Sequence, residues 1–170
     1  LSLCNIEPDS RQAAVKRVKD WIDKAYFFSC RKILIASGKG YSDDASKNKA
    51  IEALKDSIME LCRYAQSVAK DYILDVTLEF FNDKGEPNFL MGPSKEATGF
   101  AAIIKEECEN FELTFDLSHA IQLGESPARS YENAKAYTSH IHIANCVTKD
   151  PSSIFFGDRH PPVGIDGGDV

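Results

Sequence analysis

The sequence predicts an α/β fold built on a parallel sheet, in one domain that spans residues 1–170. Short apolar runs alternate with helical segments along the chain, and the runs lack the polar alternation of half-exposed strands. Strand, helix and strand in repeated order call for parallel pairing through right-handed crossovers. Two architectures meet this requirement: an open doubly wound sheet and part of an eight-stranded (β/α)8 barrel. The alternation alone does not separate them, but the polar residues do.

The first half of the chain contains one strand end, two helices and one complete strand. Residues 1–4 have the composition of a strand end, and Asp9 or Ser10 can cap the helix that follows. Residues 32–38 form a short apolar run ended by glycine, which is typical of a fully buried parallel strand. The next helix begins at 42–44 with acidic residues near the positive end of its dipole. The stripes expected to face the core are Ala14, Val18, Trp21, Ile22 and Ala25, then Ile51, Leu54, Ile58, Leu61, Cys62, Ala65 and Val68.

The second half repeats the alternation and adds a long loop. A helix begins at Ser126, which is followed by proline in the first turn. The loop is rich in Gly, Pro and Asn, and long loops that follow strands often carry function. The expected elements are a buried strand at 73–80, the loop at 82–93, a helix at 94–108 with Phe100, Ile103 and Ile104 facing inward, and strands at 113–117 and 140–144.

The composition narrows the class of protein. A net charge of −6 argues against a nucleic-acid partner, because phosphate backbones select clustered Lys and Arg. No apolar run approaches the roughly 20 residues that cross a bilayer, and no secretory signal is visible. Five scattered cysteines without a CxxC pair suit a reducing cytoplasm. The chain begins without Met inside an apparent strand and stops after a loop, so we expect a piece of a longer protein.

Three polar residues end three consecutive predicted strands. Glu79 and Asp116 each close a run that is otherwise nearly all apolar, and His142 has the same placement on the next strand. A salt bridge at a barrel rim would explain one such carboxylate, because a buried bare charge is costly. Three on neighbouring strand ends point to a common centre. Two carboxylates and one imidazole suit one divalent cation such as Mn, Mg, Co or Zn.

The other histidines fall close to the same strand ends. His119 could complete the metal shell, contact the substrate or be a structural histidine, and we favour the substrate. His140 shares a face with His142 and is expected to lie deeper, as a packing group or a support for the ligand. The last loop carries Asp158, Arg159 and His160 before paired prolines. This loop could be a solvated turn, an anion clamp through Arg159 or a second metal site, and the sequence leaves these alternatives open.

Three segments together resemble a known superfamily. LTFDLSH at 113–119, HIHIANCV at 140–147 and GDRHPPVGIDGG at 157–168 are similar to the xylose isomerase-like TIM barrels. That superfamily contains sugar isomerases and epimerases, inosose dehydratases and the endonuclease IV group. The resemblance covers nearly the whole chain, from the end of barrel strand three to the loop after strand seven. It implies an incomplete barrel in which strands one, two and eight are missing.

The resemblance also implies a ligand set and a reaction. Glu79, Asp116 and His142 match metal ligands of strands five, six and seven, and His119 matches a histidine that contacts substrate. A fourth ligand, a glutamate on strand eight, would lie beyond Val170. The implied reaction is isomerisation or epimerisation of a sugar or sugar phosphate by proton transfer through an enediolate, with Glu79 as catalytic base. The segment alone would then hold half of the catalytic pair and be inactive.

Other functions on the same barrel compete with this reading. A dehydratase or lyase would use the same metal and enolate. An endonuclease IV-like phosphodiesterase would need three metals, and Asp158 with His160 resembles its D-x-H pair. No histidine lies at residues 3–6, where that group needs one, and the acidic charge counts against it as well. A barrel that binds sugar without chemistry is a third alternative. Exposed strand edges would favour a homo-oligomer.

Overall fold

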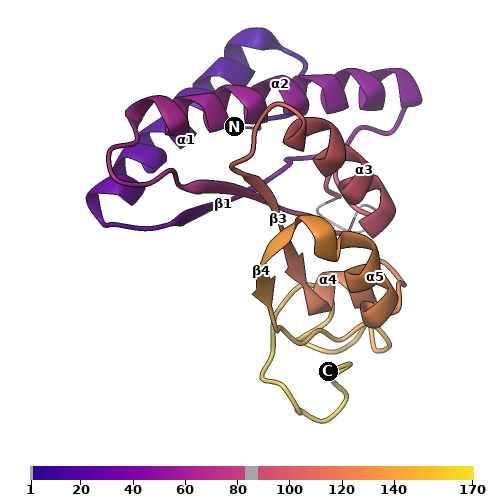
Figure 1. Cartoon of the computed structure of the whole chain (residues 1–170). Helices are drawn as coiled ribbons and strands as arrows, with labels where there is room; N and C mark the ends of the chain where they lie inside the picture. Colours follow the sequence, from indigo (N-terminus) through magenta and orange to yellow (C-terminus); the bar gives the residue numbers. More distant parts are fainter. Residues whose placement is uncertain (1, 83–87) are drawn as a thin grey trace.

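A computed structural model of the chain describes residues 2–82 and 88–170. It contains helices and strands in alternation, and Figure 1 shows their arrangement. In chain order they are α1 (Pro8–Phe27), β1 (Lys32–Ala36), α2 (Asp44–Val68), β2 (Asp75–Glu79), α3 (Ser94–Lys105), β3 (Phe111–Asp116), α4 (Leu117–Gln122), α5 (Pro127–Ala134), a 3-10 turn (Lys135–Tyr137) and β4 (Thr138–His142). The predicted loop at 82–93 falls partly on residues 83–87, which lie outside the described residues.

The four strands form one sheet in the order β1-β2-β3-β4, and all neighbours are parallel. Each crossover leads to the next strand in the same direction, and the strand order never reverses. Because such crossovers are right-handed, they place their helices on one side of the sheet (Figure 1). A doubly wound sheet needs a point where the strand order reverses. The order therefore matches a segment of a barrel, as expected.

The core lies between the two central strands and the helices that cover them. Val76 and Leu78 of β2 and Leu113 of β3 are fully buried, and so are Leu54 and Ile58 of α2. Full burial of each such side chain contributes about 1.5–3 kcal/mol to folding. The two central strands are therefore the best-packed part of the sheet, and their last residues are held in place by the same packing.

α2 begins after Asp43 and α5 begins after Ser126 with proline in its first turn, as predicted, but α1 begins earlier than expected. The Asp43 carboxylate accepts a hydrogen bond from the Ser46 amide at 2.8 Å, as an N-cap should. In α1, Pro8 occupies the first turn after Glu7, so the prediction of Asp9 or Ser10 as cap is wrong. Proline is favoured there because its missing N–H is not needed.

Two residues expected to face the core point outward instead. Trp21 is 55% exposed, with the Lys24 ammonium 4.3 Å from its ring centroid, and Val15 takes the buried position in α1. Ile103 of α3 is also exposed, although Phe100 and Ile104 are buried as predicted. In both helices the stripe of apolar residues is wider than the face that packs against the core, and these two residues lie at its exposed edge.

The strand predictions need correction at the edges of the sheet. Residues 2–4 form a turn rather than a strand, and the Leu3 carbonyl accepts a hydrogen bond from the Ser57 hydroxyl of α2 at 2.8 Å. Of the five residues of β1, Ile35 alone is buried, so this strand is not the fully buried one predicted. His140 of β4 is exposed rather than deeper than His142. β1 and β4 are the sheet's outer strands, and each pairs on one side only.

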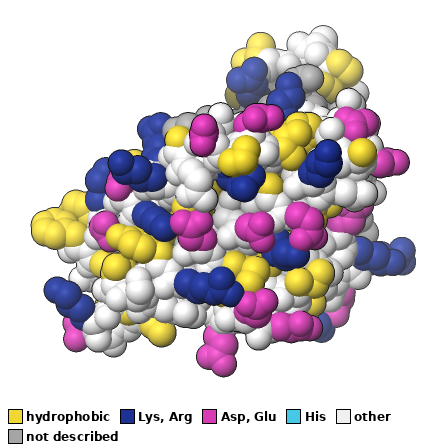
Figure 2. Space-filling view, turned by 90° about the horizontal axis from the view of Figure 1, so that it is seen from above, with side chains coloured by type: hydrophobic (Ala, Val, Ile, Leu, Met, Phe, Trp, Pro, Cys, Tyr) yellow, Lys and Arg dark blue, Asp and Glu magenta, His cyan; other side chains and the backbone are white. Residues whose placement is uncertain are grey.

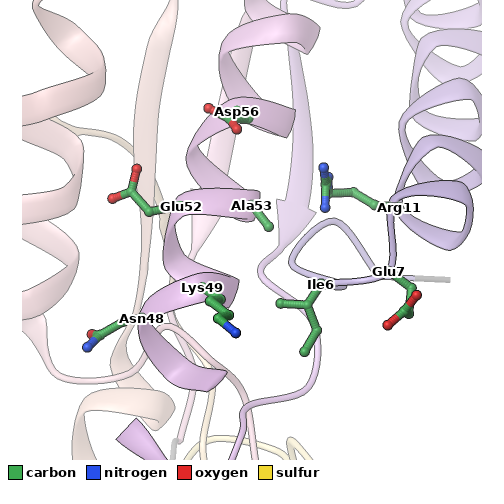
Figure 3. Close-up of a pocket in the computed structure, with 8 residues that line it drawn as sticks. All are labelled: Ile6, Glu7, Arg11, Asn48, Lys49, Glu52, Ala53 and Asp56. Carbon is green, nitrogen blue, oxygen red and sulfur yellow. The ribbon is translucent and has the colours of Figure 1, made fainter. Parts of the chain in front are cut away.

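The helical surface carries mixed charge. Figure 2, which looks down on the molecule from above, shows Lys, Arg, Asp and Glu side chains interspersed and no histidine on that face. A groove of about 600 Å³ lies between the start of α1 and the first half of α2, and Arg11, Lys49, Glu52 and Asp56 line it (Figure 3). It contains none of the predicted site residues. Among the described helices, none is long and apolar enough to span a membrane.

Candidate metal centre

The structure brings the ends of three strands together at one edge of the sheet. Glu79 is the last residue of β2, Asp116 of β3 and His142 of β4. His142 Nδ1 lies 2.8 Å from Glu79 Oε1 and 3.5 Å from Asp116 Oδ2. One donor atom from each of the three lies within 4.8 Å of the others. The sequence prediction that these side chains converge agrees with this geometry.

Strand register explains how the carboxylates meet. Asp116 pairs directly with His142, whereas Glu79 pairs with Thr114, two residues before Asp116 on the same face of β3. The longer glutamate side chain spans that offset. Below it, the Thr114 hydroxyl donates to the Thr77 hydroxyl at 2.9 Å. This buried threonine pair lies two residues before the carboxylates, on the same face of β2 and β3.

The three candidate ligands differ in burial. Glu79 is 4% exposed and Asp116 is fully buried, but the His142 side chain is 36% exposed. Burial raises the pKa of Glu79, and the imidazoles of His119 and His142 act against that rise. Two carboxylates in so small a volume need a positive partner, because unpaired buried charge is strongly unfavourable.

Asp116 shows where such a partner fits. Its Oδ1 accepts hydrogen bonds from the Ser118 amide at 2.7 Å, the Ser118 hydroxyl at 2.6 Å and the His119 amide at 3.4 Å. Its Oδ2 is buried and has no hydrogen-bond partner among the described residues. Buried polar atoms are nearly always satisfied. An orphaned carboxylate oxygen beside an imidazole and a second carboxylate therefore fits a divalent cation.

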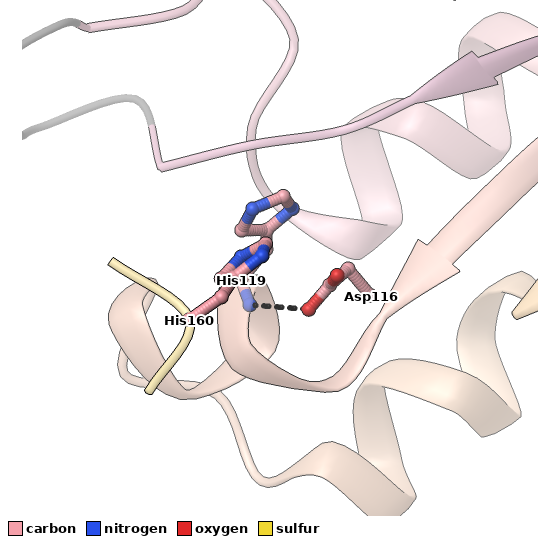
Figure 4. Close-up of side chains that lie close together, drawn as sticks. All are labelled: Asp116, His119 and His160. Atoms are coloured by element: carbon pink, nitrogen blue, oxygen red, sulfur yellow. Dashed lines mark hydrogen bonds between the residues drawn. The ribbon is translucent and has the colours of Figure 1, made fainter. Parts of the chain in front are cut away.

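The histidines and the last loop form the other side of this centre (Figure 4). His119 Nε2 lies 3.3 Å from Asp158 Oδ1, and His160 Nε2 lies 2.7 Å from the same oxygen. Asp116, His119 and His160 also make a second group that could hold an ion. Arg159 is exposed beside them. The structure thus places His119, Asp158 and His160 at the predicted centre and leaves the Arg159 side chain at the surface.

The charges of His119 and Asp158 support each other. Burial lowers the pKa of His119, but the hydrogen bond to Asp158 and the nearby carboxylates of Asp116 and Glu79 outweigh it and raise the pKa overall. The same hydrogen bond lowers the pKa of Asp158 to about 2, against the opposing effect of burial. Asp158 is therefore ionised at neutral pH, and its carboxylate shifts the pKa of His119 upwards.

Sequence reasoning missed the short helix that holds His119. α4 begins directly after β3, and the Asp116 carboxylate is its N-cap. The signal was present, since Asp before a segment that contains Ser and His is a favourable cap. It also missed Phe81. The ring centroid of Phe81 lies 4.2 Å from that of His119, and the ring stacks on that of Phe89 with 4.3 Å between the two centroids. The Phe81 ring therefore lies against the buried imidazole, and Phe89 packs on Phe81.

Solved structures share this fold at low sequence identity. A D-tagatose 3-epimerase-like protein matches with a TM-score of 0.74 and 17% identity, over 97% of this chain and 57% of that one. D-Psicose 3-epimerase from Clostridium cellulolyticum H10 matches with a TM-score of 0.68 and 21% identity, over 83% of this chain and 47% of that one. The IOLI protein, solved with a zinc atom, matches with a TM-score of 0.70 and 15% identity, over 85% of this chain and 48% of that one. The chain thus spans about half the length of these structures.

Other solved structures with this fold extend the range of reactions. They include a probable 3-DHS dehydratase from Bacillus anthracis and an AP endonuclease of family 2 from Brucella melitensis, each with a TM-score of 0.62. No curated protein matches the sequence. The model of one protein family, the xylose isomerase-like TIM barrel, matches residues 1–168. This match confirms the resemblance inferred from the sequence motifs. The partial barrel is confirmed by the solved structures, of which this chain covers about half. The chain belongs to the xylose isomerase-like TIM barrel family.

Proposed function

We propose that this chain supplies the metal-binding part of a sugar isomerase or epimerase. In this proposal Glu79, Asp116 and His142 hold one divalent cation. The observation that carries it is the buried, unpartnered Oδ2 of Asp116, which lies 3.5 Å from His142 Nδ1. The solved epimerases that share the fold support a sugar as substrate, whether phosphorylated or not. When bound, the cation polarises a carbonyl oxygen and stabilises the negative charge that develops on it.

Glu79 is the proposed catalytic residue. Its Oε1 accepts a hydrogen bond from His142 Nδ1 at 2.8 Å and lies 3.7 Å from His119 Nδ1. Burial raises its pKa, which brings the carboxyl closer to the range in which a general base works. A proton taken from the carbon next to a carbonyl can reside on Glu79 and return from it. Isomerisation and epimerisation both need such a transfer.

His119 and the loop at 158–160 are proposed to contact the substrate. His119 Nδ1 is buried and has no hydrogen-bond partner among the described residues, so it can serve a substrate oxygen. Its Nε2 is held by Asp158, which fixes the ring. His160 and Arg159 follow in the same loop and lie nearer to solvent. In this proposal the charged and polar side chains of the loop border the metal site on its solvent side.

The number of metal ions bound per chain tests the proposed metal centre. We expect the 170-residue chain to bind Mn²⁺ at one ion per chain, as measured by equilibrium dialysis with elemental analysis. Three ions per chain would favour the endonuclease-like alternative, and no bound ion would remove the metal centre altogether.

Turnover is proposed for a chain that carries the rest of the barrel, because this one covers about half of the solved relatives. Such a chain, incubated with ketoses and Mn²⁺, should give an epimer or isomer of equal mass. A product lighter by one water would instead identify a dehydratase, and Glu79→Gln should abolish either product. Epimerisation by the 170-residue chain alone would contradict the expectation that the missing part supplies a catalytic group.

A further inference from the structure

Ser118 is the second residue of α4 and lies between the two groups of candidate ligands. It is fully buried, and its Oγ lies 2.6 Å from Asp116 Oδ1 and 3.3 Å from His160 Nε2. The Ser118 backbone carbonyl also lies 3.7 Å from the Cys146 thiol. No other hydroxyl among the described residues joins a strand-end ligand to the loop at 158–160 by hydrogen bonds to both. This position makes Ser118 a candidate for more than core packing.

The direction of its hydrogen bonds follows from proton counting. An ionised carboxylate only accepts, so the single hydroxyl proton of Ser118 is donated to Asp116 Oδ1. Towards His160 the hydroxyl oxygen must then accept, which requires a proton on His160 Nε2. Asp158 Oδ1, 2.7 Å from the same nitrogen, requires that proton as well. A proton on His160 Nε2 is thus shared between Asp158 and Ser118, and a ring nitrogen that carries a proton has no lone pair for an ion.

The two carboxylate oxygens of Asp116 therefore have different roles, because Oδ1 accepts hydrogen bonds from the described residues and Oδ2 does not. Ser118 supplies two of the three donors that bind Oδ1, the amide and the hydroxyl. A carboxylate held in this way cannot turn without breaking charge-assisted hydrogen bonds. Its Oδ2 is therefore kept toward Glu79 and His142, where it has no other partner among the described residues.

We propose that Ser118 is a positioning residue, which keeps Asp116 Oδ2 free to serve the metal centre and ties the His160 loop to it. The proposal rests on the metal centre proposed above. Groups that orient a metal ligand typically contribute 10–100-fold to metal affinity, although they do not touch the ion.

Mn²⁺ affinity of Ser118 variants, measured by isothermal titration calorimetry on the full chain, tests the proposal. Ser118→Ala should bind Mn²⁺ about 10–100-fold more weakly than the unaltered chain. Ser118→Thr keeps the hydroxyl and should stay within about threefold, well short of the loss expected when the orienting bond is removed. The matched control is Ser130→Ala in α5, because Ser130 is equally buried and its hydroxyl has no hydrogen-bond partner among the described residues. Thermal unfolding with EDTA present shows that each variant is folded.

Two results would overturn the role of Ser118 while the metal centre stands. One is an affinity of Ser118→Ala equal to that of Ser130→Ala. The other is an equal loss in Ser118→Ala and Ser118→Thr, which would trace the effect to packing rather than to the hydroxyl. If the unaltered chain binds no Mn²⁺, the proposed metal centre itself fails, and the inference about Ser118 fails with it.

Discussion

The two central strands and the edge strand β4 supply the candidate metal centre in different ways. Glu79 and Asp116 end β2 and β3, which have neighbours on both sides, and their side chains are 5% and 0% exposed. His142 ends β4, which pairs with β3 alone, and its side chain is 36% exposed. The carboxylates are therefore held by the core, whereas the imidazole is held by one strand pairing and its contact with Glu79. Charge is preorganised on the buried side of the centre.

The largest effect is expected on the buried side. Asp116→Asn keeps the shape but removes the charge, so Mn²⁺ affinity should fall by more than about 100-fold, beyond the loss typical of groups that only support a ligand. Asp75→Asn is the matched control, since Asp75 begins the neighbouring strand β2 and pairs with Lys32 at 2.7 Å instead. Calorimetric titration of both variants with Mn²⁺ measures the two affinities. Equal affinities would mean that the buried carboxylate does not bind the ion.

A smaller effect is expected on the exposed side. His142→Ala should weaken Mn²⁺ binding by about 10–100-fold, because a partly exposed ligand can be replaced in part by water. His140→Ala tests the same strand without the proposed ligand, since the two rings lie 4.9 Å apart and His140 is exposed. It should leave the affinity unchanged. A loss for His142→Ala larger than that for Asp116→Asn would reverse the comparison between core and edge.

The smallest effect concerns Asp158, which lies on the exposed loop. Its pKa in the folded chain is lowered to about 2 from an ordinary value of 3.8. A lowered pKa stabilises the folded state above pH 3.8, and this contribution is lost as the pH falls towards 2. Because the side chain is 39% exposed, we expect at most about 1 kcal/mol. Urea unfolding in EDTA should show a smaller loss between pH 4 and pH 2 for Asp158→Asn. Parallel curves for the two chains would contradict the ion pair with His119.

The sequence by itself determined the parts of the centre that depend on strand ends. Parallel strands place their carboxyl ends on one edge, so Glu79, Asp116 and His142 could be grouped before any contact was known. Their residue types then indicated a cation rather than a nucleophile. The motifs at 113–119, 140–147 and 157–168 added the family, which the match to residues 1–168 confirmed.

Only the tertiary structure decided which atoms are free and which are paired. Spacing could not show that Asp116 caps α4 through Oδ1 and leaves Oδ2 unpartnered, because this depends on a side-chain rotation set by Ser118 and His119. It could not show that His140 is exposed, because burial of an edge strand depends on what lies beside it. It left the loop at 158–160 open between a solvated turn, an anion clamp and a second metal site, and did not foresee the contact of Asp158 with His119, since a loop of this length can close in many ways. Sequence pattern fixes which face and which end a residue occupies, whereas packing fixes the direction of each donor and lone pair.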